Sequence, residues 1–287
     1  MISRTDAKVI SELFYLLDTN VRNDLYHNRI ADERDYVSRL VTHFNYPFGI
    51  FNQFCFKHIK FQSKWFANVN SGHYERKFGC DSMIVFRVKN KIKVGLFEAK
   101  WPRVIKDPKY QWDYTQKSTK TSHFTNQILR QAKWISNAAI WEMFFYEGKV
   151  GKLNSPFDKK ASTCVRHSYS DLLVSSTPSL QTIWNNSDLA TLIQSAQTSS
   201  FNGTSETNIR QIIFDILTCN FGKPIEIAPN DKTFDLISKD NDESVKCPII
   251  STSEENESNE IVNGFMSENG LSFFQQLNIE TPNVTKE

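Results

Sequence analysis

Three residues in the middle of the chain have the types and the spacing that metal-assisted phosphodiester hydrolysis requires. Asp81 stands at the start of one β-rich run, and Glu98 and Lys100 stand at the end of the next. Two carboxylates supply the hard oxygen ligands that Mg²⁺ prefers, and the ion activates a water molecule. Lys100 would hold or deprotonate that water and add positive charge beside the transition state. The sequence therefore predicts a metal-dependent active site.

The segment 82–99 predicts a β-hairpin, because two runs rich in β-branched and aromatic residues flank a polar turn at 89–91. If the strands pair around this turn, residues whose numbers sum to about 181 face each other, so Asp81 lies opposite Lys100. Residues two apart on a strand share a face, so the side chains of Glu98 and Lys100 project to the same side. If the turn has an even number of residues, the side chain of Asp81 projects to that side too. A slip of one residue would turn Asp81 away.

The elements around the hairpin predict an α/β fold. Apolar residues at helical spacing indicate helices on both sides of the hairpin and a strand after the second helix, which gives a mixed sheet flanked by helices with additional C-terminal helices. The expected helices span 6–17, 31–44, 123–138, 188–196 and 206–219, the further strand spans 140–148, 50–69 is irregular or partly strand, and 264–279 forms a short docking helix.

Cys80-Asp81, followed by Glu98-Ala99-Lys100 at the end of the next strand, resembles the motif of the PD-(D/E)xK nuclease superfamily, with Cys80 in place of the usual proline. The resemblance covers about residues 30–147. It implies a restriction-endonuclease-like core and a nuclease that uses Mg²⁺ or Mn²⁺.

The same resemblance implies roles for residues outside the hairpin. A glutamate on the preceding helix matches Glu33, and a glutamine on the following helix matches Gln127, with Gln131 one turn further on. The implied catalytic residues are Asp81, Glu98, Lys100 and Gln127, and the implied metal ligands are Asp81, Glu98, the carbonyl of Ala99, and Glu33.

A loop rich in lysine and aromatic residues follows the second strand of the hairpin. Lysines can bind phosphates while aromatic rings stack on splayed bases, although packing of the rings against the core is an equal alternative. His73 and His123 lie near the motif, but surface or core roles are more common for such residues. The candidate nucleic-acid-binding residues are Lys106, Lys109, Tyr110, Trp112, Lys117, Lys120 and Arg130.

The two ends of the chain differ in charge. Residues 231–287 contain 12 acidic and 4 basic side chains, whereas the rest contains 30 basic and 20 acidic ones. A basic body attracts nucleic acid, although a solvated lysine-rich surface explains the same charge. We therefore expect a nuclease domain with helical additions over 1–230 and an acidic, partly flexible tail over 231–287.

Composition narrows the class of protein further. No apolar run approaches the roughly 20 residues that cross a bilayer, and the first residues lack the pattern of a Sec signal, so we expect no membrane association. The five cysteines are odd in number and form no CxxC pair, which argues against a disulfide framework or a cysteine zinc site. A cytoplasmic location is expected, with export by another route left open.

The expected function is hydrolysis of phosphodiester bonds in nucleic acid, with DNA favoured over RNA. A homodimer would suit paired cutting, because its two-fold symmetry matches that of a duplex. Three alternatives stay open: a catalytically inactive restriction-like fold that binds nucleic acid or protein, a nuclease effector secreted by a non-Sec route, and a scaffold in which the motif is fortuitous.

Overall fold

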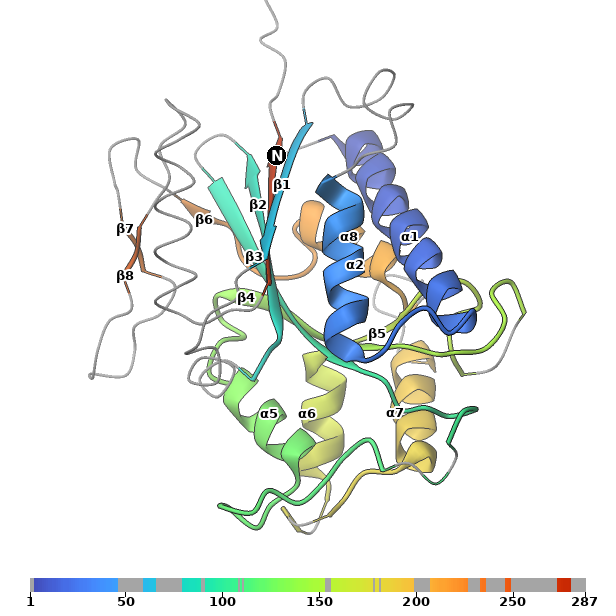
Figure 1. The fold of residues 1–287 in the computed structure, drawn as a ribbon. Helices are drawn as coiled ribbons and strands as arrows, with labels where there is room; N and C mark the ends of the chain where they lie inside the picture. The colour runs from blue at the N-terminus through green and yellow to red at the C-terminus, as the bar shows by residue number, and fades with distance from the viewer. Residues whose placement is uncertain are drawn as a thin grey trace, which may run out of the picture.

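The computed structural model describes residues 3–45, 59–65, 79–88, 91–107, 109, 111–152, 156–177, 179–180, 182–198, 207–226, 233–235, 246–248 and 273–279. Most of these residues form an α/β structure in which helices cover a mixed sheet (Figure 1). The predicted fold class, a mixed sheet flanked by helices, is confirmed. None of the helices in these ranges is long and apolar enough to cross a membrane.

A seven-stranded sheet runs through the middle of the molecule in the order β1-β9-β2-β3-β4-β5, with β6 paired to β3. The hairpin strands β2 and β3 are antiparallel, whereas β4 is parallel to β3 and β9 is parallel to β2. The strands are β1 (Ile59–Trp65), β2 (Ser82–Val88), β3 (Lys91–Lys100), β4 (Ala138–Phe144), β5 (Thr163–Arg166), β6 (Ile225–Glu226) and β9 (Phe273–Ile279); β7 (Thr233–Asp235) and β8 (Lys246–Pro248) form a separate pair.

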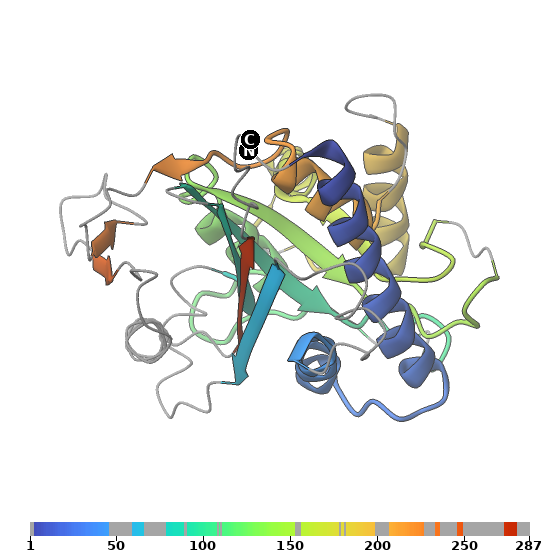
Figure 2. The ribbon, with the colours of Figure 1, turned by 90° about the horizontal axis from the view of Figure 1, so that it is seen from above.

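Two groups of helices cover the sheet, as the views in Figures 1 and 2 show. Helices α1, α2 and α8 pack on one face, and helices α5, α6 and α7 pack on the other. The helices are α1 (Arg4–Tyr26), α2 (Glu33–Asn45), α5 (His123–Gln131), α6 (His167–Ser175), α7 (Asn186–Thr198) and α8 (Ile209–Leu217).

Alternation along the central strands divides the core into two parts. On β3, Phe97 and Ala99 face the cluster formed with α1, α2 and α8. On β4, Trp141 joins that same cluster, whereas Phe144 packs with α5, α6 and α7. All seven residues of β4 are buried, as expected for a strand covered on both faces. Glu98 and Lys100 therefore project from the face that α5 covers.

The hairpin forms as predicted, but its register differs by two residues. Ser82 pairs with Phe97 and Val88 pairs with Lys91, so paired numbers sum to 179 and Asp81 lies across from Glu98 instead of Lys100. Strand β2 ends at Val88, as expected, and strand β3 begins at Lys91, within the segment that was expected to form the turn. A shift of two preserves the side-chain parity of the strand, so Asp81 keeps the face of Glu98.

The prediction of a helix near the C-terminus is wrong, because the structure has a strand there. The expected docking helix over 264–279 contains β9, which lies inside the sheet between β1 and β2. A short apolar run such as Phe273–Ile279 has no period that separates helix from strand, and its long-range partners decide. Strand β5 and helix α6 were not predicted either.

Candidate active site

The end of the β2–β3 hairpin brings Asp81 against the Glu98-Ala99-Lys100 segment. The backbone N–H of Asp81 donates to the carbonyl of Phe97 at 2.9 Å, which continues the antiparallel ladder by one residue. The carboxylate of Asp81 accepts a hydrogen bond from the backbone N–H of Ala99 at 2.8 Å through Oδ2. The aspartate is thereby fixed at the strand end where the sequence predicted it.

Glu98 and Lys100 form a buried ion pair beside Gln127. The ammonium Nζ of Lys100 lies 2.5 Å from Oε1 of Glu98, and their side chains are 7% and 1% exposed. Gln127, which α5 carries, donates from Nε2 to the same oxygen of Glu98. Two donors on one carboxylate oxygen fix its orientation, so the structure brings together three of the four predicted catalytic residues at one point, with Asp81 one strand away.

Glu33 reaches the same strand end from another layer. Helix α2 begins at Glu33, and its Oε1 accepts a hydrogen bond from the backbone N–H of Trp101 at 2.6 Å. Burial by itself lowers the pKa of Lys100, but the charges of Glu98, Glu33 and Asp81 outweigh burial and raise it above the ordinary value of a lysine. Carboxylates from α2, β3 and the start of β2 therefore act together on one ammonium.

Helix α5 is held tightly against the residues that precede Asp81. Ser122 caps the helix by accepting from the backbone N–H of Thr125 at 2.9 Å. Gly79 has a φ of +67°, and a Cβ added there would lie 2.6 Å from the carbonyl oxygen of Gln127. Only a glycine combines this left-handed backbone with so close an approach. Gly79 therefore lets the Asp81 segment and the Gln127 helix meet.

A second set of buried polar residues lies behind the site, and the sequence analysis missed it. Glu142 on β4 pairs in register with Glu98 on β3 and is fully buried. Its Oε2 accepts from the hydroxyl of Ser170 at 2.6 Å, and its Oε1 lies 3.9 Å from Nδ1 of His167. The signal that marked Glu98, an acid inside an apolar strand, applies equally to Glu142 and could have found it.

This second set is connected to the Asp81 segment through α5. Oε1 of Gln131 lies 2.8 Å from Nδ1 of His167, and its Nε2 donates to the carbonyl of Gly79 at 2.7 Å. The thiol of Cys80 lies among these groups. Burial, and then the charges of Glu98, Glu142 and Asp81, raise its pKa well above the ordinary value. Gln131 therefore links His167 to the backbone two residues before Asp81.

His123, which was not assigned a role, lies at the edge of the site. Burial, and then the positive charges of Lys100 and Arg130, lower its pKa to about 3. Its ring stacks on Tyr114, with centroids 4.6 Å apart and planes at 14°. A neutral imidazole is therefore expected here at every physiological pH. His73 lies outside the described residues.

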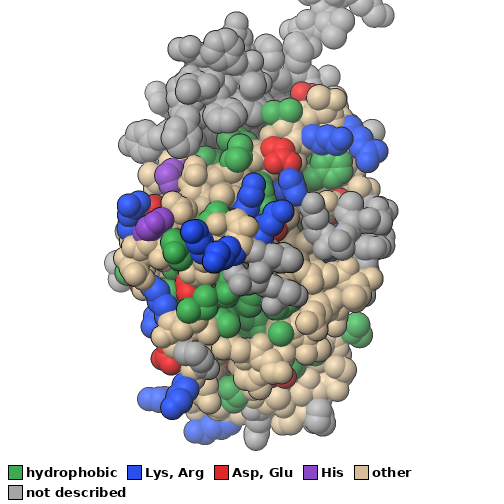
Figure 3. Space-filling view, turned by 90° about the vertical axis from the view of Figure 1, so that its right-hand side faces the viewer, with side chains coloured by type: hydrophobic (Ala, Val, Ile, Leu, Met, Phe, Trp, Pro, Cys, Tyr) green, Lys and Arg blue, Asp and Glu red, His purple; other side chains and the backbone are tan. Residues whose placement is uncertain are grey.

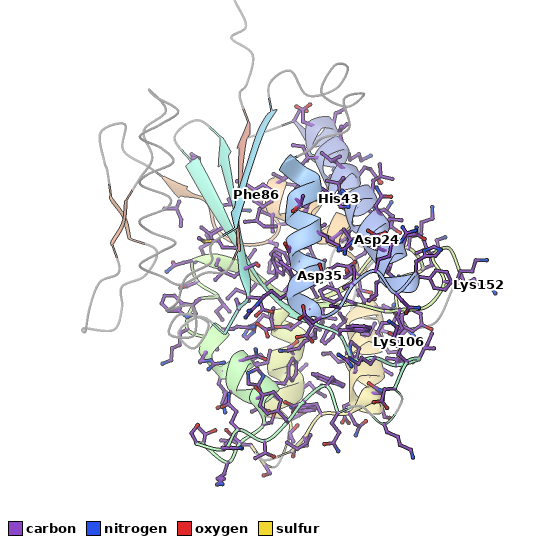
Figure 4. All side chains as sticks on the ribbon, in the orientation of Figure 1. Asp24, Asp35, His43, Phe86, Lys106 and Lys152 are labelled. Carbon is purple, nitrogen blue, oxygen red and sulfur yellow. The ribbon has the colours of Figure 1, made fainter. Side chains whose placement is uncertain are left out.

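The candidate nucleic-acid-binding residues differ in their exposure to solvent. Lys106, labelled in Figure 4, is exposed, and its Nζ lies 4.8 Å from the ring centroid of Trp101. Trp112 is a correction, because its side chain is 6% exposed and packs edge-on against Phe124 and Phe144 in the core, where no base can stack on it. Of the rest, Lys109, Lys117 and Lys120 are exposed, Arg130 is partly buried, and Tyr110 lies outside the described residues.

The oxygen atoms at the end of β3 are of the kind that binds Mg²⁺, but they do not surround a complete metal site. In the described part of the chain, no group of three or more His, Cys, Asp and Glu side chains could hold a metal ion. Glu33, also expected as a ligand, accepts from the N–H of Trp101 through Oε1. Mg²⁺ usually takes only one or two protein carboxylates and keeps several waters, so Asp81 and Glu98 with the carbonyl of Ala99 fit its needs.

No protein-family model, no curated protein and no solved structure matches this chain.

Proposed function

We propose that this chain is a metal-dependent nuclease with a restriction-endonuclease-like core, and that DNA is its preferred substrate. One observation carries the proposal: a single buried ammonium, that of Lys100, lies in the field of three carboxylates that come from three separate elements. Crowding like charges is unfavourable for folding, and such clusters occur where chemistry requires them.

Asp81 and Glu98 would hold Mg²⁺, and the bound ion would supply an activated water and stabilise charge on the phosphate. The chain's own residues prepare this arrangement. The N–H of Ala99 fixes the Asp81 carboxylate, and Gln127 together with Lys100 fixes that of Glu98. A carboxylate held by such donors loses little freedom when it binds a cation, which favours binding.

Lys100 supplies the positive charge that a phosphodiester needs beside it. Its ammonium contacts Glu98 at the end of β3, where a scissile phosphate would approach Asp81. Fixed cations in a water-poor site stabilise the charge that develops on a pentacoordinate phosphate. Glu33 sets the position of this strand end through the N–H of Trp101.

The experiment that tests the proposal incubates purified protein with linear and circular duplex DNA, single-stranded DNA and RNA, each with Mg²⁺, Mn²⁺ or EDTA. We expect cleavage that requires a divalent ion and is abolished in Lys100→Ala. Lys91→Ala, which changes an exposed lysine on the same strand, serves as the matched control and should cleave normally. Intact nucleic acid under every condition would reject the nuclease in favour of a binding or interaction module.

A further inference from the structure

A loop that follows β4 presents four lysines to solvent. Lys149, Lys152, Lys159 and Lys160 are all exposed, and among the described residues none forms an ion pair or a hydrogen bond with their ammonium groups. Below, these four residues are called the lysine loop. Figure 3, which faces this side of the molecule, shows Lys and Arg side chains gathered in the middle of the surface.

The acids of the same segment point inward and are engaged by protein groups. Glu147 is 5% exposed, and its Oε1 accepts from the backbone N–H groups of Ile105 at 2.6 Å and Lys106 at 2.9 Å. Asp158 accepts from the hydroxyl of Tyr15 at 3.1 Å and from the backbone N–H of Lys160 at 2.9 Å. In this segment, therefore, the carboxylates are bound by protein groups and the ammonium groups are exposed to solvent.

The lysine loop is also held in place. The N–H of Gly151 donates to the carbonyl of Lys159 at 2.7 Å, which ties the two limbs together. From α1, the buried guanidinium of Arg22 donates to the carbonyls of Asp158 and, at 2.7 Å, Ala161. A fixed scaffold reduces the entropy that ordering would cost on binding a partner.

The loop adjoins the candidate active site. Strand β4 continues beyond Phe144 by the bond from Phe145 N–H to the carbonyl of Lys100 at 2.9 Å, and the lysine loop begins four residues later. Glu147 bonds the loop that carries Lys106. Figures 1 and 2 both show the segments after β3 and after β4 along the same edge, and Figure 4 labels Lys106 and Lys152 on that side.

We propose that the lysine loop binds the phosphodiester backbone of a nucleic acid and extends its path from Lys106 along this edge. The inference rests on the proposed nuclease for its biological meaning, but it concerns binding and not cleavage. Exposed ammonium groups that have no carboxylate partner can neutralise phosphates. Such contacts position the nucleic-acid backbone but do not distinguish one base sequence from another. The sequence predicted this role for the loop 101–120 and not for the four lysines between 149 and 160.

The test measures binding in EDTA, so that no cleavage is possible, by fluorescence anisotropy of a labelled 30-base-pair DNA duplex, the single strand and the matching RNA. Lys152→Glu/Lys160→Glu is compared with Lys133→Glu/Lys223→Glu, which changes two other exposed lysines, one just after α5 and one just before β6. We expect at least a tenfold decrease in affinity for the first pair only. The salt dependence should weaken by about 0.9 in log–log slope for each duplex phosphate that the variant no longer neutralises.

The outcomes separate this inference from the proposed function. Equal affinity and salt slope for the two double variants, or no binding by the unmodified protein to any of the three probes, would overturn the lysine loop as a backbone-binding surface, even if the protein cleaves DNA. A selective decrease in binding supports it, even if no cleavage is found with any metal. The probe that shows the larger decrease identifies the form of nucleic acid.

Discussion

Two buried polar clusters differ in how they balance charge. Between α1, α2 and the segment before β5, Asp18 accepts from the hydroxyl of Tyr36 at 2.7 Å and from the N–H of Ser162 at 2.6 Å. Arg22 donates to the carbonyl of Tyr146 at 2.6 Å and to two more backbone carbonyls. The two carboxylates that act on Arg22, those of Asp18 and Asp158, are both held by neutral donors.

The cluster at the end of β3 has more carboxylates around its single cation. Three carboxylates, those of Glu98, Glu33 and Asp81, act together on the pKa of Lys100. The first cluster joins segments more than a hundred residues apart in sequence and so stabilises the fold. The second concentrates acids at a strand end, at a cost in stability. This difference supports our proposal that the first cluster stabilises the fold and the second serves the proposed chemistry.

The largest expected effect comes from changing one aspartate to asparagine in each cluster. Asp81→Asn keeps an oxygen for the N–H of Ala99 but removes a charge, so we expect nuclease activity to fall roughly 10³-fold with unchanged or increased stability. Asp18→Asn is the matched control and should retain activity per folded molecule. Cleavage rates and urea unfolding measure both. If Asp81→Asn is as active as the unmodified protein, the cluster at the end of β3 is not the active site.

The second prediction concerns pH and stability. Burial, offset in part by Tyr36 and Ser162, raises the pKa of Asp18 from 3.8 to about 6. Between about pH 4 and 6 the folded protein therefore binds more protons than the unfolded chain, so the contribution of Asp18 to the free energy of unfolding is greatest below this window and is lost as pH rises through it.

The expected change is about 3 kcal/mol, since each pKa unit corresponds to about 1.4 kcal/mol. It is measured as the difference in urea unfolding free energy between the unmodified protein and Asp18→Asn from pH 4 to pH 7. A difference that stays constant with pH would show that Asp18 titrates normally and would contradict the expected direction.

A smaller effect is expected behind the site. Gln131→Met removes the bond to the carbonyl of Gly79 and the contact with His167, so the Asp81 segment loses a support. We expect a roughly 10- to 100-fold decrease in cleavage and a higher Mg²⁺ concentration at half-maximal rate. Gln197→Met, which breaks a comparable 2.8 Å bond to the carbonyl of Pro156, is the control and should leave both quantities unchanged. Parallel decreases in the two variants would indicate general destabilisation.

The smallest effect is expected for the other buried lysine of β3. Lys93 projects to the opposite face from Lys100, and its ammonium donates to the carbonyls of Ile216 at 2.6 Å and Phe221 at 2.7 Å, at the end of α8. Lys93→Met should lower the unfolding free energy by about 1 kcal/mol and leave cleavage intact. Absence of cleavage in a variant that melts normally would mean that the two faces of β3 are coupled.

The central part of the site could be predicted because its signals are local. The parity of a hairpin depends only on its turn and its alternation, so Asp81 was placed with Glu98 even though the register was displaced by two residues. The helical spacing before Val37 placed Glu33 on a helix, and the run after Ser122 placed Gln127 on another. Each of these inferences required contacts only between neighbours in sequence.

The remaining features depended on distant partners. Trp112 has the composition of a base-stacking residue, but its burial depends on Phe124 and Phe144, which only the packing of α5 on β4 brings to it. The lysine loop lies next to Lys106 only because Glu147 reaches across to the segment after β3. Neither contact produces a periodic pattern in the sequence from which it could be predicted.

By itself, then, the sequence determined the types of the candidate reacting groups, the hairpin that carries Asp81 and Glu98, and the alternation that puts Lys100 on their face. Only the tertiary structure decided that β9 enters the sheet beside β2, that Glu142 and His167 lie behind Glu98, and that Glu33 bonds the N–H of Trp101. The reason is physical: local periodicity fixes which way a side chain points, whereas its partner depends on how separate elements pack.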